Sequence, residues 1–369
     1  MLLGSFAPDR AQMAAGVRPS NDVRVLEEHL GADVYDFDTM RTSAQSSRWA
    51  RWLCRIAERT NQWSAILAIQ TARTIRRYDV VYVSGEDIGI YSCLISRLLP
   101  GRSTRFIVRF ERSSYGRTRW RHFVYLRHLR LASRGMDVAI CRTSAIAQAL
   151  RSSTSMPRSR VLAFGQEIDT TFFDPDSAPS VPPPITEPYI LSAGLERRDY
   201  TTLLEAAEGL PIRLVIAAGS PWSKDQFHTT RELPANVTVG TYNHQQMREL
   251  YRHARLVVLC VLPTERACGM NVVGEAWAMR RPVIASATEG MSEYISSGGN
   301  GLLVAPGSVD DVRDAIATLL GSPDRADLLA ANGAEYVRST LSLDNFLSTV
   351  RRAIEVSERG VPTSDERAG

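Results

Sequence analysis

The run Thr264–Arg280, TERACGMNVVGEAWAMR, joins a turn of small residues to a carboxylate one helical turn later. Asn271 is predicted to cap the following helix, which leaves the backbone N–H groups of residues 272–274 without intrahelical partners. These amides lie at the positive end of the helix dipole and suit a diphosphate or sugar hydroxyls. Glu275 could bridge the two hydroxyls of a ribose. The alternative is an ordinary capped helix whose early glutamate complements the dipole.

Short apolar runs alternate with helical patterns through the second half of the chain. The predicted strands are Tyr189–Ala193, Ile212–Ala218, Val237–Val239, Leu256–Leu262 and Val283–Ala285. The predicted helices are Tyr200–Glu208, Gln245–His253, Asn271–Arg280 and Asp310–Leu320. Strands that read as continuous apolar runs between helices indicate a parallel sheet covered on both faces. Such a doubly wound sheet binds ligands beyond the carboxyl ends of its strands.

The first half shows a weaker form of the same pattern. Its predicted strands are Asp79–Ser84, Phe106–Phe110, Val138–Cys141 and Val161–Phe164. The fold class expected is therefore α/β, with two Rossmann-like doubly wound domains facing a cleft.

A proline-rich segment, Asp174–Pro188, separates the two patterns and holds six of the eighteen prolines. Proline disfavours helices and central strands, so an extended linker is predicted there. The expected domains are an N-terminal Rossmann-like domain at residues 1–173 and a C-terminal one at residues 189–340. Residues 341–369 are expected to form a final helix, which can cross back to the first domain, and a polar tail.

The bulk composition is that of a soluble globular protein, with 44% hydrophobic and 23% charged residues in 369. Residues 1–10 reach an acid and a base too early for the apolar part of a signal peptide. No stretch stays apolar for the roughly 20 residues that cross a bilayer. Five cysteines are widely scattered, which favours a reducing compartment, and a cytoplasmic location is expected.

The basic residues are nearly all arginine, since Lys224 is the one lysine among 44. Any phosphate clamp must therefore rely on arginine or on backbone amides. Residues 101–160 carry 14 arginines against Glu111 and Asp137. This charge suits an anionic acceptor, a membrane surface or nucleic acid. Peripheral membrane contact through Arg102–Arg160 and a partly buried helix with an arginine rim remain alternatives. Nucleic acid is not expected, because no motif accompanies the charge.

Residues 274–285, GEAWAMRRPVIA, resemble the C-terminal half of the retaining glycosyltransferases of family 4 (group 1), which have the GT-B fold. Four further segments resemble parts of the same family in the same order, namely Phe164–Phe173, Leu191–Tyr200, Thr288–Ile295 and Asn300–Gly307. The resemblance covers about residues 137–340. It implies transfer of a sugar from a nucleotide-diphosphate sugar to an acceptor hydroxyl, with retention at the anomeric carbon. It implies no metal and no other cofactor.

The resemblance also implies roles for individual residues. Glu275 matches the family glutamate that binds ribose. The family's sugar-contacting glutamate lies eight residues earlier, where this chain has Ala267, so Glu265 can take that role only if the turn bulges. Leu195 replaces an arginine of the family's phosphate loop, and Arg198 is the expected substitute that stabilises the leaving diphosphate.

Further contacts follow from the same alignment. The donor contacts expected are Gly194, Arg197, Tyr242, Asn243, His244, Gly269, Met270, Asn271, Val272 and Val273, with the base near residues 242–244. The acceptor-side candidates, on N-terminal loops, are Gly16, Glu86, Asp87, Glu111 and Arg112. The alternative for these polar residues is an ordinary solvated loop.

Two other functions stay open at this stage. The same paired-domain fold also occurs in sugar-nucleotide epimerases. The departures at Leu195 and Ala267 fit a degenerate partner subunit without activity of its own.

Overall fold

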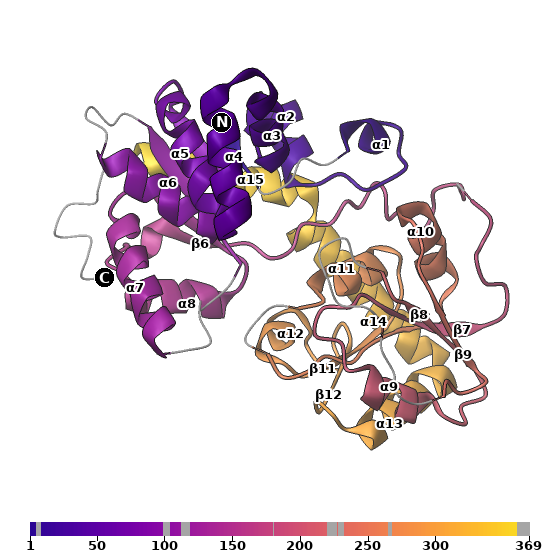
Figure 1. Cartoon of the computed structure of the whole chain (residues 1–369). Coiled ribbons are helices and arrows are strands. Elements are labelled where there is room, and N and C mark those ends of the chain that lie inside the picture. Colours follow the sequence, from indigo (N-terminus) through magenta and orange to yellow (C-terminus); the bar gives the residue numbers. More distant parts are fainter. Residues whose placement is uncertain are drawn as a thin grey trace. The chain divides into compact units, whose positions relative to one another are not determined.

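The computed structural model describes residues 1–4, 9–98, 104–111, 119–179, 181–219, 227, 232–264 and 268–359, without the side chains of Ala44, Ser46, Arg119 and Arg121. The chain divides into two compact units (Figure 1). The first unit contains residues 1–10, 21–165 and 346–369, and the second contains residues 11–20 and 166–345.

The first unit is built on a parallel sheet in the order β2-β1-β3-β4-β5-β6. Its strands are β1 (Leu2–Leu3), β2 (Val34–Tyr35), β3 (Val80–Val83), β4 (Arg105–Phe110), β5 (Val138–Cys141) and β6 (Val161–Ala163). Its helices are α2 (Asp22–Leu30), α3 (Phe37–Ser46), α4 (Arg48–Thr60), α5 (Trp63–Ile75), α6 (Glu86–Leu98), α7 (Arg119–Ser133), α8 (Ser144–Ser153) and the short η1 (Arg158–Arg160). The four strands predicted for this half are confirmed to within one residue at each end.

The last helix, α15 (Leu343–Glu358), belongs to this first unit from Phe346 onward. Phe346 is fully buried and its ring lies 6.2 Å from that of Tyr82 in β3 and 5.6 Å from that of Phe164. The guanidinium of Arg109 lies 5.5 Å above the same ring. Part of one face of the first sheet is therefore covered by α15.

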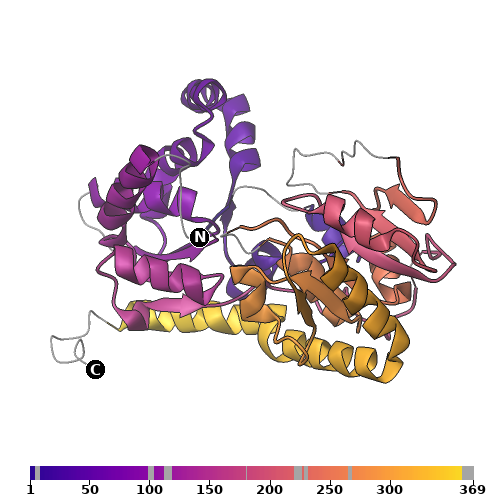
Figure 2. The same ribbon diagram turned by 90° about the horizontal axis from the view of Figure 1, so that it is seen from below.

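The second unit has a parallel sheet in the order β12-β11-β10-β7-β8-β9, with helices on both faces (Figure 2). Its strands are β7 (Tyr189–Ala193), β8 (Arg213–Ala217), β9 (Val237–Gly240), β10 (Val257–Leu259), β11 (Val283–Ser286) and β12 (Leu302–Val304). Its helices are α1 (Arg10–Ala14, mostly in this unit), α9 (Tyr200–Ala207), α10 (His244–His253), α11 (Met270–Ala278), α12 (Glu289–Tyr294), α13 (Val309–Gly321), α14 (Pro323–Tyr336) and η2 (Val337–Leu341).

Successive strand residues feed two separate cores, because side chains alternate between the faces of a sheet. Tyr189, Leu191 and Ala193 of β7 join one core, and Ile190 joins the other. The doubly wound architecture predicted for both halves is confirmed, since both sheets are wholly parallel and interleaved with helices.

The proline-rich segment is not a linker between the units, because the units divide after Gly165 and residues 174–188 belong to the second unit. Its first residues are held by Arg252 of α10 and by Arg280, which follows α11. Arg252 donates to the carbonyl oxygens of Asp174 and Pro175, and Arg280 forms a two-pronged ion pair with Asp176 at 2.7 and 2.9 Å. Prolines leave carbonyl groups unpaired by secondary structure, and arginines satisfy them here.

Gly333 of α14 lies against the fully buried indole of Trp277, so that a Cβ at this position would lie 2.2 Å from the ring. We expect Gly333→Ala to destabilise the protein by about 1–3 kcal/mol through overpacking, despite the roughly 1 kcal/mol gained in helix propensity. Gly321→Ala is the control, because open space surrounds that position. Urea unfolding of the full chain measures both. Equal stability of the two variants would contradict the packing argument.

Candidate functional site

The order in which the chain adds strands to the second sheet reverses between β7 and β10, which are parallel, hydrogen-bonded neighbours. After β7 the chain proceeds to β8 on one side, and after β10 it proceeds to β11 on the other. Doubly wound sheets bind ligands in the crevice at such a switch point, beyond the carboxyl ends of the strands. The segments that follow β7 and β10 hold Arg198 and the start of α11, and Arg198 forms a bridge to Val261.

Arg198 lies at this switch point with its guanidinium turned back toward the end of β7. Its Nε donates to the carbonyl oxygen of Ala193 at 2.8 Å, and its Nη1 donates to that of Glu196 at 2.8 Å. Burial lowers the pKa of Arg198 below its ordinary value. Among the described residues, no carboxylate forms an ion pair with it. A guanidinium has five N–H donors, so this cation keeps donors for an anion.

Gly194 leaves space for the guanidinium of Arg198, and Gly269 lies nearby against Leu259. Gly194 has φ +89°, and a Cβ there would lie 2.6 Å from Nη2 of Arg198. Gly269 has φ +93°, and a Cβ there would lie 2.5 Å from Leu259 and 3.5 Å from Nη1 of Arg198. Both positions favour glycine for their backbone conformation and for the lack of room. The structure thus brings together the predicted residues Gly194, Arg198 and Gly269.

Glu275 extends the same cluster from α11. Its Oε2 accepts a hydrogen bond of 2.9 Å from the hydroxyl of Tyr251, a fully buried residue of α10. Burial raises the pKa of Glu275 to about 7, and the Tyr251 hydrogen bond opposes this shift. Tyr251 also interacts electrostatically with Arg198. We call Arg198, Tyr251 and Glu275 the Arg–Tyr–Glu cluster.

Tyr251 did not emerge from the sequence. It lies on the buried side of a predicted helix, where an aromatic residue ordinarily serves the core, and its ring packs edge-on against Phe173 at 6.0 Å. A tyrosine in such a position usually finds a partner for its hydroxyl, and this partner is Glu275.

The N-terminus of α11 differs from the prediction by two residues. Gly269, not Asn271, is the N-cap, and its carbonyl oxygen accepts the N–H of Val273 at 3.1 Å. The amides ahead of this first bond are therefore those of Met270, Asn271 and Val272, rather than those of residues 272–274. The positive φ of Gly269 turns the chain into the helix without a side-chain cap. Asn271 is exposed, whereas Met270, Val272 and Val273 are buried.

The other predicted donor contacts lie in nearby turns. Arg197 adopts φ +56° and donates to the carbonyl oxygen of Pro263 at 2.6 Å. Tyr242 and Asn243 lie between β9 and α10, and His244 is the first residue of α10. Asn243 caps α10 by accepting the N–H of Gln246 at 2.9 Å. Within the described ranges, no hydrogen bond or ion pair joins Tyr242, Asn243 or His244 to the Arg–Tyr–Glu cluster.

Gly16 belongs to the second unit, not to the N-terminal domain in which the sequence placed it. The end of its segment is tied to this unit, because the N–H of Ser20 donates to Asp169 at 2.7 Å. Burial and the charge of Arg18 lower the pKa of His244. The Gly16 segment therefore approaches the turn predicted for the base. Gly16 is exposed with φ +66°.

Three acceptor-side candidates of the first unit already have partners. Glu86 is buried and accepts the N–H of Glu111 at 3.0 Å. Asp87 accepts the hydroxyl of Ser64 at 2.7 Å. Glu111 pairs with Arg142 at 2.5 Å. Their role toward an acceptor stays a prediction. Arg112 and Glu265 lie outside the described residues.

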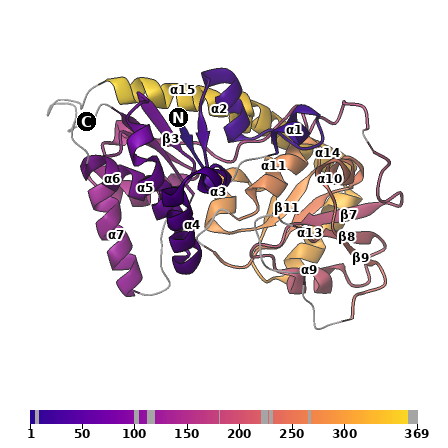
Figure 3. The same ribbon diagram turned by 45° about the horizontal axis from the view of Figure 1, so that its top comes forward.

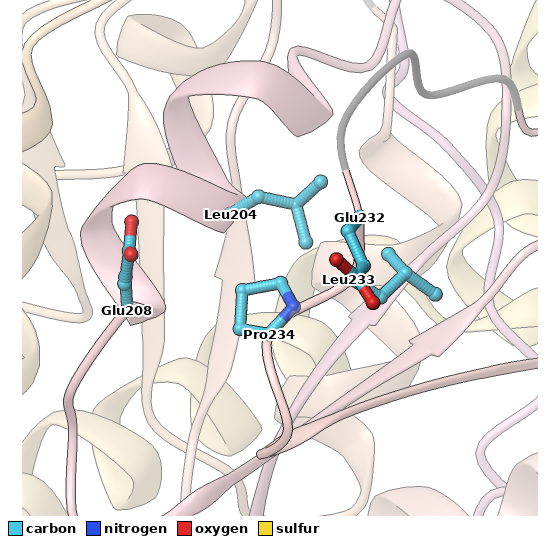
Figure 4. Close-up of a pocket in the computed structure, with 5 residues that line it drawn as sticks. All are labelled: Leu204, Glu208, Glu232, Leu233 and Pro234. Carbon is cyan, nitrogen blue, oxygen red and sulfur yellow. The ribbon is translucent and has the colours of Figure 1, made fainter.

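A pocket in the second unit lies at the opposite edge of the sheet (Figure 4). It is lined by Leu204, Glu208, Glu232, Leu233 and Pro234, near the amino ends of β8 and β9. Ligands of doubly wound sheets bind at the carboxyl ends, so this pocket is not part of the candidate site. Over the described part of the chain, no three metal-ligating side chains gather.

The segment predicted for membrane contact includes α7. Trp120 and Phe123 on this helix are exposed at 72% and 63%. The membrane contact through Arg102–Arg160 stays a prediction. Within the described residues, every helix is too short or too polar to cross a membrane.

Glu275 makes the stability of the fold depend on pH. Its pKa is about 7 in the folded chain, against an ordinary value of about 4.3 when unfolded. Between these values the folded chain holds a proton that the unfolded chain has lost, so stability falls as pH rises through this window. Glu275→Gln removes this dependence. We expect the Tm of Glu275→Gln minus that of the wild type to increase as the pH is raised from about 5 to about 8. For the exposed control Glu208→Gln, the same difference should not change with pH. A gap between Glu275→Gln and wild type that does not vary with pH would contradict the assignment.

Solved structures share the architecture of this chain over most of its length. Anabaena HepE in complex with UDP and glucose covers 96% of this chain and 98% of its own, with TM-score 0.64 and 13% identity. The trehalose 6-phosphate synthase of Burkholderia multivorans covers 85% of this chain and 78% of its own, with TM-score 0.65 and 14% identity. These similarities confirm the GT-B class of fold, with two Rossmann-like domains.

The relatives in sequence named here match less than half of the chain. A GDP-mannose-dependent phosphatidylinositol monomannoside mannosyltransferase of Mycobacterium tuberculosis is 32% identical over 172 residues, which cover 42% of this chain and 44% of the relative. The α-D-kanosaminyltransferase of Streptomyces kanamyceticus is 29% identical over 37% of this chain and 35% of its own. The matches thus span less than half the length of either relative. The family model described as "Glycosyl transferases group 1" matches residues 191–322. With its Arg–Tyr–Glu cluster at the switch point, this part of the chain is a group 1 glycosyltransferase domain.

Proposed function

We propose that the protein transfers a sugar from a nucleotide-diphosphate sugar to an acceptor hydroxyl, and that the Arg–Tyr–Glu cluster binds the donor. The observation that carries the proposal is the partly buried Arg198, which has only carbonyl oxygens as hydrogen-bond partners among the described residues. A buried cation without a carboxylate partner is costly unless an anion joins it. A diphosphate is such an anion, and arginine binds it through charge-assisted hydrogen bonds.

The remaining parts of the donor fit the surroundings of Arg198. The N–H groups of Met270, Asn271 and Val272 precede the first bond of α11 and can donate to phosphate oxygens. Glu275 can accept from the ribose hydroxyls, which favours its ionised form. The base would lie toward Tyr242 and His244. The lowered pKa of His244 favours its neutral imidazole.

The chemistry proposed needs no nucleophile from the protein. The bond between the anomeric carbon and the diphosphate oxygen breaks, the acceptor oxygen bonds to the same face of that carbon, and the acceptor proton passes to the departing diphosphate. Arg198 and the α11 amides would stabilise the charge that grows on the leaving group. This would give retention of configuration. Support comes from the family of residues 191–322 and from this concentration of positive charge.

Removing either charged member of the cluster should weaken nucleoside diphosphate binding. We expect Arg198→Ala and Glu275→Ala each to raise the Kd of GDP or UDP by about 10- to 100-fold, the scale of a lost charge-assisted hydrogen bond. Isothermal titration of the full chain measures this. Glu208→Gln, in the pocket of Figure 4, is the matched control and should bind as the wild type does. Binding that survives at Arg198→Ala but fails at Glu208→Gln would move the site to that pocket.

Product analysis separates transfer from the alternatives. With UDP-glucose or GDP-mannose as donor and a panel of hydroxyl acceptors, we expect release of nucleoside diphosphate that EDTA leaves unchanged, because arginine and amides replace a metal. An epimerase would exchange the proton beside the anomeric carbon with solvent and release no diphosphate in step with a new glycoside. A chain that binds no nucleoside diphosphate at all would fit the partner-subunit alternative.

A further inference from the structure

Helix α4 (Arg48–Thr60) of the first unit packs on the core through one side only. Ala50, Leu53, Cys54 and Ala57 are buried, and the helix packs against α3 and α5 (Figure 3). These four residues recur at helical spacing and supply the contact with the core. The residues on the outward side are therefore not explained by packing.

Two tryptophans lie on that outward side. Trp49 is 59% exposed and Trp52 is 51% exposed, and their rings stack with centroids 4.9 Å apart. A single exposed apolar residue is ordinary, but two indoles in contact form a continuous apolar area. Indole has an apolar body and one N–H, and it is enriched where a membrane meets water.

Four arginines of α4 lie to one side of the pair. Arg48, Arg51, Arg55 and Arg59 are all exposed, and Glu58 is the one acid on the helix. Within the described parts of the chain, none of the four forms an ion pair. At 100° per residue, Trp52 falls at the edge of the sector that holds Arg55, Arg48 and Arg59, so cations and an indole are neighbours on one surface. This surface carries a net charge of about +3, in a form free to meet anions.

We propose that Trp49, Trp52 and these four arginines dock the protein on an anionic membrane surface. The guanidinium groups would contact lipid phosphates, and the indoles would lie at headgroup depth. The lack of exposed aliphatic side chains among them limits the contact to that depth. Charge selects an anionic partner, and the stacking of the indoles on each other leaves fewer ring faces for nucleic acid bases, which bind by stacking.

The proposal is independent of donor binding and is tested with the full chain and two kinds of vesicle. We expect cosedimentation with vesicles of phosphatidylglycerol and phosphatidylcholine, little with phosphatidylcholine alone, and a decrease at high salt. Trp49→Ala/Trp52→Ala should lower partitioning about tenfold, and Arg51→Glu/Arg55→Glu about thirtyfold or more. The matched control, Arg351→Glu/Arg352→Glu, changes the net charge equally at exposed positions of α15 and should bind as the wild type does.

A second measurement locates the contact. Vesicles should shift tryptophan emission to the blue, and Trp49→Phe/Trp52→Phe should abolish the shift while Trp120→Phe on α7 retains it. GDP or UDP binding should be unchanged in every variant, and an unchanged far-UV circular dichroism spectrum reports that the first unit is folded. The proposal fails if the wild type ignores anionic vesicles, if the α15 control loses as much as the α4 variant, or if Trp120→Phe alone removes the shift. Binding of single-stranded RNA in place of vesicles would also overturn it.

Discussion

The guanidinium of Arg198 constrains the residues that can lie beside it at the switch point of the second sheet. A Cβ at position 194 would lie too close to this cation, and Gly194 avoids that contact. Its hydrogen bonds to Ala193 and Glu196 hold the loop after β7 in place. The start of α11 is fixed from the other side by Gly269 and its positive φ. The loop after β7 and the start of α11 are thus both positioned around the guanidinium of Arg198.

The carboxylate of Glu275 shows the opposing demands of folding and binding. Burial works against its ionised form, and the hydroxyl of Tyr251 works for it. A core tyrosine of α10 therefore helps to orient a carboxylate of α11 that we propose binds the donor. Proteins commonly accept such a cost at functional sites, since the same group would be more stable in solvent.

Strand positions were predictable because buried parallel strands are apolar runs, and β5 and β7 match residue for residue. Arg198 and Glu275 followed from the family resemblance and the helix dipole. The N-cap of α11 was missed because a glycine with positive φ leaves no side-chain signature, and Tyr251 because its sequence position indicates only burial. Residues 174–188 were mistaken for a linker, since nothing local reveals that Arg252 and Arg280, roughly a hundred residues later, hold them. The Trp49–Trp52 pair depends on which side of α4 is buried, which tertiary packing alone decides.

The position of Phe346 has a consequence for synthesis. The sheet of the first unit consists of residues that leave the ribosome early, yet Tyr82, Arg109 and Phe164 wait for a ring encoded near the end of the chain. The unit whose sheet is translated first therefore completes its packing only after Phe346 has been synthesised. While the second unit is being made, the part of the nascent sheet beneath Phe346 stays uncovered, and exposed apolar surface of this kind is where aggregation begins.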